Sequence, residues 1–486
     1  MQSRTFLIAL CLILPAGALA GILGSRLFQP ANQATTTNAP DLTAAGSDSG
    51  LPLEDGTPTP TPDQDASHLE SSPVHPFDLT SFDTRDQLES PSLAIDHHGR
   101  VYLAWASQLA ETTLGLQLTT STDGGQTFQK PRTIHRCDRF EFSARMRGRE
   151  IKRSSRLLPH LSTQGDRLYI AWVEGGKTLA DVSYVVAYSD DGGETISAPT
   201  RAHASTSSRA SFTGFASGPN GTLVCTWLDA RNRAQQLFAS MRRPDSQGFA
   251  PEQCLDAGQQ ERGVCPCCPT SSVIGENGTA VVAYRNSVDG YRDIWITQSK
   301  PNSDQFLPPR KLIAPRWEFK GCPHDGPTLA LQGDHLYVAW MDAHSETQRI
   351  YLAQGPLSTE QFEPLEIAPQ LAGSQSHPSL AVDSEQTVHV VWDQGLEVAA
   401  SESQTGNSSQ HKGHRHGAPA ASGRAIMYAQ RPVGAKEFST PQAVDQAAGV
   451  FQSRPAIALG EEGEVYVSWN AFTETGKQTV VRRLAP

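Results

Sequence analysis

The stretch Pro327–Trp340, with the sequence PTLALQGDHLYVAW, decides the fold. Apolar residues alternate from Leu329, a turn follows at Gly333-Asp334, and a second apolar run ends at Trp340. Period-two alternation on both sides of a turn predicts a hairpin of two short antiparallel strands. The same pattern recurs on either side in the chain, ending at Trp105, Trp172, Trp227, Tyr284, Trp392 and Trp469. Seven copies of one repeat therefore organise the chain.

Further strands follow most copies of the repeat. A third apolar segment leads to a turn and a fourth short segment, with a closing residue at Phe128, Ile196, Phe249, Phe306, Phe362 or Phe438. Four antiparallel strands repeated around a ring leave only short, protected edges. We predict an all-β protein, a β-propeller of seven four-stranded blades, with six blades and a diverted copy as the alternative. The last copy has room for three strands, so residues 77–82 are expected to supply its fourth.

Two of the turns carry a specific motif. Ser121–Phe128 reads STDGGQTF, and Ser189–Ile196 repeats it with Ile in the last position. This motif resembles the Asp-box (BNR) repeat of the sialidase superfamily, and the resemblance implies a sialidase-like propeller. The Asp side chain of such a turn accepts backbone N–H groups, so its chemistry is structural. For true sialidases the resemblance implies an arginine triad, a Tyr–Glu nucleophile pair and an Asp acid. The Arg-Ile-Pro motif of the first blade is missing, and Glu89-Ser90-Pro91 stands in its place. No catalytic residue is therefore carried over.

The N-terminal region predicts export. Residues 1–24 have the charged, apolar and small-residue order of a signal peptide, and a membrane anchor is the alternative. Residues 25–75 are rich in Pro, Thr and Ser, and such a composition predicts a disordered linker. The propeller is expected over residues 76–486. The predicted location is outside the cytoplasm: periplasmic, secreted or anchored facing outward.

Charge limits the set of partners. The formal net charge of −11 argues against general nucleic-acid binding, because phosphate contacts require a basic surface. A membrane contact is expected only through an N-terminal anchor, and we expect a monomer. The connection 136–156 is nevertheless rich in Arg and Lys, a pattern that suits either an anionic ligand or a solvated face.

Cysteine and histidine concentrate in the connections that enter the repeats just before their proline, here called entry loops. In a propeller these loops lie on the face opposite the Asp boxes and lead into the innermost strands. The candidate metal ligands are Cys265, Cys267, Cys268, Cys322, His324 and His377. Thiolates with imidazole favour Zn²⁺ or copper, and Cys265, Cys268, Cys322 and His324 would complete a tetrahedral site. Disulfides are the alternative for an exported protein. A His-rich tract, HKGHRHG at 411–417, lies in an insertion on the same face.

Acidic and basic residues follow the aromatic ends of the repeats. A glycosidase needs a proton donor and a nucleophile or base on either side of one bond. The candidates of the right type are Asp229, Asp342, Arg231, Arg285 and Arg292. Three functions stay open: a binding propeller with a Cys/His metal site or a small anionic ligand at the channel mouth, a glycoside hydrolase acting on acidic glycans, and a protein-interaction scaffold.

Overall fold

The computed structural model describes residues 75–78, 90–139, 141–146, 149–154, 156–175, 182–206, 208–232, 234–259, 263–396, 423–446, 450–473 and 476–484. By its internal contacts the chain divides into residues 1–66 and 67–486, and every described residue belongs to the second unit. Three predicted segments lie outside the described residues. They are the signal segment at residues 1–24, residues 25–74 of the linker, and the His-rich tract at 411–417.

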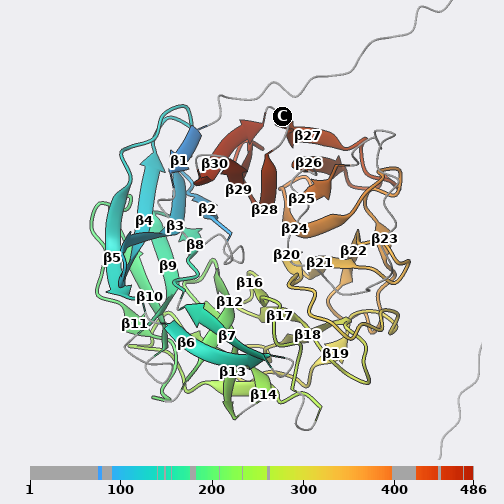
Figure 1. Cartoon of the computed structure of the whole chain (residues 1–486), viewed down its shortest axis with the longest axis horizontal. Helices are drawn as coiled ribbons and strands as arrows, with labels where there is room; N and C mark the ends of the chain where they lie inside the picture. The colour runs from blue at the N-terminus through green and yellow to red at the C-terminus, as the bar shows by residue number, and fades with distance from the viewer. Residues whose placement is uncertain are drawn as a thin grey trace, which may run out of the picture. The chain divides into compact units, whose positions relative to one another are not determined.

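The described strands form antiparallel sheets arranged around a ring, with the first strand of each sheet innermost (Figure 1). The first sheet has β2 (Ser92–Ile95), β3 (Val101–Ala110), β4 (Thr113–Ser121) and β5 (Arg132–Asp138). The second has β8 (His160–Gln164), β9 (Arg167–Glu174), β10 (Ser183–Ser189) and β11 (Thr200–Arg201). The third has β12 (Ala210–Ser217), β13 (Leu223–Asn232), β14 (Ala234–Arg242) and β15 (Gln253–Asp256). A separate hairpin, β6 (Glu141–Met146) and β7 (Arg149–Ser154), lies between the first two sheets in sequence.

The remaining strands continue the same order. The fourth sheet has β16 (Ser271–Ile274), β17 (Ala280–Arg285), β18 (Ile294–Gln298) and β19 (Arg310–Lys311). The fifth has β20 (Thr328–Gln332), β21 (His335–Asp342), β22 (Arg349–Pro356) and β23 (Leu365–Glu366). The sixth group has β24 (Gln375–Val382), β25 (Val388–Gly395), β26 (Arg424–Arg431) and β27 (Gln442–Asp445). The seventh has β28 (Phe451–Leu459), β29 (Val465–Thr473), β30 (Gly476–Leu484) and β1 (His75–Asp78).

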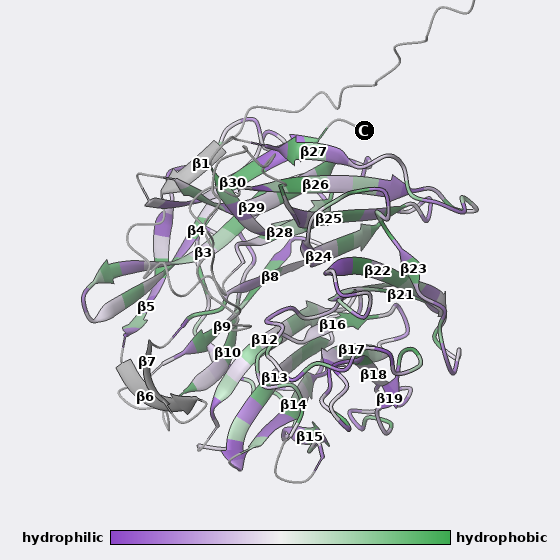
Figure 2. Ribbon diagram, turned by 45° about the vertical axis from the view of Figure 1, so that its right-hand side comes forward, coloured by the Kyte–Doolittle hydropathy of each residue, from purple (hydrophilic) through white to green (hydrophobic). Residues whose placement is uncertain are grey.

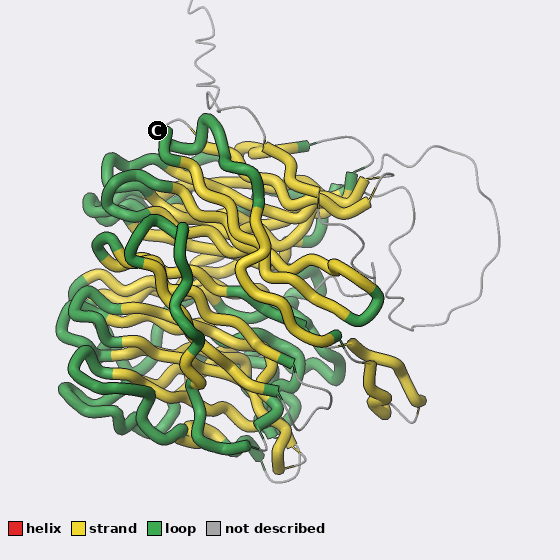
Figure 3. The backbone as a smooth tube through the Cα atoms, turned by 90° about the vertical axis from the view of Figure 1, so that its left-hand side faces the viewer, coloured by secondary structure: helices red, strands yellow, loops and turns green. Residues whose placement is uncertain are grey.

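This arrangement is the predicted all-β propeller. Figure 3 shows strands and loops throughout the described residues, and no helix among them is long and apolar enough to cross a membrane. The last group takes its outer strand from the N-terminal side, because β1 pairs antiparallel with β30 from His75↔Val481 to Asp78↔Gln478. This strand begins a few residues earlier in the chain than the predicted segment 77–82. A parallel contact, Arg424↔Phe451, joins the sixth and seventh groups into one larger sheet.

The tryptophans that end the repeats pack between neighbouring sheets, and we call them wedge tryptophans. Trp172, Trp227, Trp340, Trp392 and Trp469 are all less than 2% exposed. Trp340 of β21, for example, packs in one cluster with Ala283 and Ile296 of the preceding sheet. Figure 2 shows apolar segments within many of the strands. The apolar alternation seen in the sequence therefore packs sheet against sheet rather than one strand pair alone.

Both Asp boxes form the expected turn. The Asp123 carboxylate accepts hydrogen bonds from the backbone N and the hydroxyl of Thr127, at 2.9 and 2.5 Å, and from Ser121 Oγ at 2.7 Å. Asp191 makes the equivalent bonds with Thr195 and Ser189. The glycines of both turns have positive φ angles between 68° and 89°, which glycine adopts without strain.

We expect Asp123 to titrate at unusually low pH. The hydroxyl and backbone N–H of Thr127, with the hydroxyl of Ser121, stabilise the carboxylate and lower its pKa to about 2. Replacing Thr127 with Val removes one donor, so the pKa of Asp123 should rise towards the ordinary value of about 3.9. An NMR pH titration of the Asp carboxyl carbons measures this, and Asp191, whose pKa is also about 2, is the internal control. An unchanged Asp123 pKa in Thr127→Val would contradict the assigned role.

Candidate functional site

A cavity of about 720 Å³ occupies the central channel. Its lining includes residues at or near the entry of the innermost strand of all seven groups. In chain order these include Ser90, Pro91, Arg156, Leu158, Pro159, Phe212, Pro266, Cys267, Cys322, His324, Asp325, His377, Pro378, Arg454 and Pro455. Entry loops that are far apart in sequence thus share one cavity.

Several entry loops place a residue in an unusual backbone conformation. Leu158, His377 and Arg454 each precede a proline and have φ angles of 45°, 51° and 58°. A residue before proline normally adopts an extended conformation with negative φ. The register of β24 shifts between Ser376 and Ser379, and that of β28 shifts between Ser453 and Ala456. A bulge of this kind re-aims a side chain. His377 and Arg454 occupy these bulges, and both line the cavity.

Three cysteine thiols meet in the entry loop before β16. The Sγ atoms of Cys265, Cys267 and Cys268 lie 3.8, 3.5 and 4.0 Å apart, and all three side chains are buried. A tetrahedral zinc site with Zn–S bonds of about 2.3 Å has S···S edges of about 3.8 Å. The triangle of thiols therefore has the dimensions of one face of such a site. Among the described cysteines, Cys225, Cys254, Cys265, Cys267 and Cys268 are free thiols.

A second group of donors shares Cys267. The donor atoms of Cys267, Cys322 and His324 also lie within 4.8 Å of one another. Five of the six predicted ligands are therefore in two adjoining trios, with Cys267 in both. His377 belongs to neither trio. Because Cys267, Cys322 and His324 line the cavity, this donor set faces the channel.

The three clustered thiols differ in their acidity. Hydrogen bonds from Cys267 and Cys268, with a contribution from Arg285 and Arg292, hold the pKa of Cys265 well below its usual range. The pKa of Cys267 is raised, since its thiol donates to neighbouring sulfurs, and burial raises the pKa of Cys268 to about 12. One thiolate is thus favoured before any cation enters, and a bound cation would favour further deprotonation.

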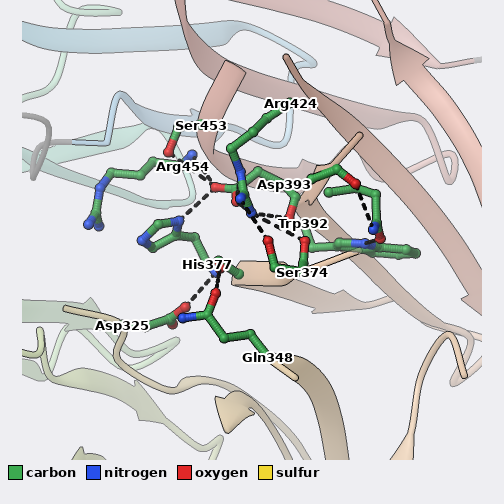
Figure 4. Close-up of polar contacts among 12 residues, drawn as sticks. Asp325, Gln348, Ser374, His377, Trp392, Asp393, Arg424, Ser453 and Arg454 are labelled. Atoms are coloured by element: carbon green, nitrogen blue, oxygen red, sulfur yellow. Dashed lines mark hydrogen bonds and ion pairs between the residues drawn. The ribbon is translucent and has the colours of Figure 1, made fainter. Parts of the chain in front are cut away.

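A buried carboxylate organises the channel wall at the sixth and seventh groups (Figure 4). Asp393, 0% exposed, accepts hydrogen bonds from His377 Nδ1 at 2.6 Å, Arg424 Nε at 2.9 Å and the Arg454 backbone N at 3.0 Å. Ser453 Oγ donates a further bond at 3.1 Å. Burial alone would raise the pKa of Asp393, but Arg424 and His377 outweigh it and hold the pKa well below its usual range. Asp393 therefore fixes the orientation of His377 and the backbone of Arg454.

Asp325 extends this network to the fifth group. Its Oδ2 accepts a 2.7 Å hydrogen bond from the backbone N of His377. Figure 4 shows His377 between the carboxylates of Asp325 and Asp393. Asp325 is 1% exposed, and its Oδ1 has no hydrogen-bond partner among the described residues. Burial raises its pKa, although His377 and nearby arginines oppose this.

The glycosidase candidates lie outside the set of residues that line the cavity. Asp229 accepts hydrogen bonds from Trp227 Nε1 at 3.1 Å and Arg231 Nη2 at 2.7 Å. Asp342 accepts the same kind of bond from Trp340 Nε1, at 3.1 Å, and pairs with Arg316 at 2.7 Å. Both carboxylates therefore cap the indole N–H of a wedge tryptophan, which is a structural task.

The two remaining candidates, Arg285 and Arg292, hold backbone carbonyls. Arg285 is 1% exposed and donates to the carbonyl oxygens of Asp325, Arg292 and Met341 at 3.0, 2.6 and 2.7 Å. Arg292 Nε donates to the Phe319 carbonyl at 3.1 Å. Arg285 thereby anchors the entry loop that carries Cys322 and His324.

Much of the Arg-rich connection 136–156 forms the hairpin β6–β7. Arg156, at the end of this connection, lines the cavity. Asp325, Asp393, Arg424 and Arg454 were not among the site residues predicted from the sequence. One signal could have found Arg454: Ser453-Arg454-Pro455 occupies the same repeat position as Ser376-His377-Pro378.

No family model and no curated protein sequence matches this chain. Solved structures with a similar chain arrangement include a Trypanosoma rangeli sialidase in complex with sialic acid, at 11% identity and a TM-score of 0.41. That match covers 71% of this chain and 56% of the sialidase chain. A phage phi92 endosialidase matches at 10% identity and a TM-score of 0.45, over 86% of this chain and 69% of that one. A polysaccharide lyase of family PL25, an ulvan lyase, matches at 9% identity and a TM-score of 0.48, over 82% and 95% of the two chains.

Proposed function

We propose that this protein is an exported metal-binding β-propeller, with a Zn²⁺ or copper ion held in the wall of its central channel. The observation that carries the proposal is the triangle formed by the thiols of Cys265, Cys267 and Cys268, with edges of 3.5 to 4.0 Å. These edges match a tetrahedral thiolate site and are far longer than a disulfide bond of about 2.05 Å. The fourth ligand would come from Cys322 or His324, which share a trio with Cys267.

The position of this donor set favours a site that also meets a ligand. Structural zinc sites are closed by four protein donors, whereas a site with three protein donors keeps a position open. The cavity beside Cys267 and Cys322 would give a small molecule access to that position. The glycoside hydrolase alternative has less support, because Asp229 and Asp342 are engaged by tryptophan and arginine.

The metal content of protein purified from its natural export route tests this proposal. We expect about one ion per chain by elemental analysis, with zinc and copper distinguished directly, because buried thiolate sites bind these ions tightly. Replacing Cys267 with Ser should remove the ion, since Cys267 belongs to both trios. Cys254→Ser is the matched control, because Cys254 is exposed on β15, away from the cluster. Metal-free native protein whose cluster thiols are all oxidised would overturn the proposal.

A further inference from the structure

Positive charge gathers around the channel of an acidic protein. Three arginines, Arg156, Arg209 and Arg454, line the cavity, and Asp325 is the carboxylate among its described lining residues. The whole chain carries a formal net charge of −11. Clefts lined by one sign of charge concentrate ligands of the opposite sign. Apart from the thiol cluster in its wall, the cavity is therefore suited to a small anion.

Arg454 is the most strongly constrained of these arginines. Arg454 is only 6% exposed, and its backbone has a φ of 58° immediately before Pro455. The Asp393 carboxylate holds its backbone N, and one guanidinium nitrogen donates to the His324 carbonyl at 3.1 Å. Burying a guanidinium and holding a strained backbone both cost free energy, and such costs concentrate at functional sites. This arginine is thus placed at the cavity by the fold.

The groups around Arg454 indicate what the anion should look like. Asp325 lines the same cavity and interacts electrostatically with Arg454, and its Oδ1 has no partner among the described residues. A carboxylate this close disfavours a compact inorganic polyanion and favours a ligand that also donates a hydrogen bond. The cavity of about 720 Å³ has the size of a metabolite site, and much of its wall is proline and aliphatic side chains.

We propose that the channel binds a small organic acid that carries a hydrogen-bond donor beside its carboxylate, as hydroxy acids and amino acids do. The ligand carboxylate would contact Arg454 and Arg156, and the donor would face Asp325. Arginine suits this task because its planar guanidinium matches a carboxylate with two parallel hydrogen bonds. This site lies next to the thiol cluster and needs no metal ion.

Isothermal titration calorimetry tests the proposal with three probes: glucuronate, glutamate and glucose. We expect glucuronate or glutamate to bind, and which of them binds distinguishes a hydroxy acid from an amino acid. Glucose lacks the carboxylate and should not bind. Arg454→Gln should weaken binding about tenfold or more, because a charge-assisted hydrogen-bond pair is lost. If Arg454→Gln folds poorly, Arg156→Gln provides a second test. Arg156 is only partly buried, and its replacement should also weaken binding.

The control variant is Arg167→Gln, since Arg167 pairs with Asp190 at the strand ends opposite the entry loops. Each titration is repeated on protein stripped of metal and kept reduced. Binding by metal-free protein that depends on Arg454 and Arg156 supports this site whether or not the metal proposal holds. The proposal fails if neither acid binds at millimolar concentration. It also fails if Arg454→Gln and Arg156→Gln both bind the acid as tightly as the natural protein does. If binding is lost when the metal is removed but is unchanged in both arginine variants, the acid binds to the metal ion and the proposed arginine site is wrong.

Discussion

Asp393→Ala is expected to lower the free energy of unfolding by about 3–5 kcal/mol, the cost of removing one partner of a buried ion pair. Asp393 is fully buried and ties together His377 of β24, Arg424 of β26 and the backbone of Arg454 on β28. Its loss leaves the Arg424 guanidinium without this carboxylate and frees two strained entry loops. Urea denaturation followed by tryptophan fluorescence measures the change.

Two further variants make this measurement specific. Asp393→Asn keeps the shape and part of the hydrogen bonding, so its loss of stability should be smaller than that of the Ala variant. Asp334→Ala removes an exposed carboxylate from a turn and should change stability by less than about 0.5 kcal/mol. If Asp393→Ala were as stable as Asp334→Ala, Asp393 would not hold the sixth and seventh groups together.

The contribution of Asp393 also has a defined pH dependence. Its pKa in the folded protein lies well below the unfolded value of about 3.9. The folded state therefore binds the proton less readily, and the stabilisation is complete above about pH 5 and declines as pH falls through and below the unfolded pKa. The difference in stability between the natural protein and Asp393→Asn should shrink over that acidic range.

Replacing Arg285 with Met should lower the free energy of unfolding by about 3–5 kcal/mol, since two buried carbonyl groups and one partly buried one lose this donor at once. These carbonyls belong to Asp325, Arg292 and Met341, so the change also loosens the contact between the fourth and fifth groups. Methionine fills much of the same volume, which keeps a simple cavity from explaining the loss. Thermal and urea denaturation both report it.

Arg310→Met is the matched control for Arg285. Arg310 also donates to two backbone carbonyls, those of Glu360 and Leu357 at 3.0 Å, but it is only partly buried. Its replacement should cost about 1 kcal/mol. Because Arg285 anchors the Asp325 carbonyl, its variant should also bind the proposed metal ion less tightly than Arg310→Met does. Equal losses of stability in the two variants would contradict the role given to Arg285.

Much of the fold could be predicted from local sequence. Stretches such as Pro327–Trp340 alternate with period two and turn at a glycine, and both properties depend on neighbouring residues alone. The Asp boxes were equally predictable, because Asp123 bonds Thr127 only four residues away. The gathering of Cys265, Cys267 and Cys268 also follows largely from their spacing.

The roles of several charged residues were not visible in the sequence, because they depend on the direction of side chains and on long-range contacts. Asp229 and Asp342 were selected by residue type, and only the packed structure shows each one capping the tryptophan two residues before it. Asp393 meets Arg454 across 61 positions in the sequence, and Asp325 meets His377 across 52. Such pairs form when neighbouring sheets of the ring pack together.

The sequence by itself therefore determined the repeat, the strand pairs, the Asp-box turns and the entry loops rich in cysteine and histidine. These features rest on short-range hydrogen bonding and alternation, which neighbouring residues set. Only the tertiary structure decided which side chains face the channel, that Arg454 and His377 do so from bulges, and that Asp393 holds them there. Those outcomes depend on closing the ring, because closure brings the entry loops of all seven groups around a single cavity.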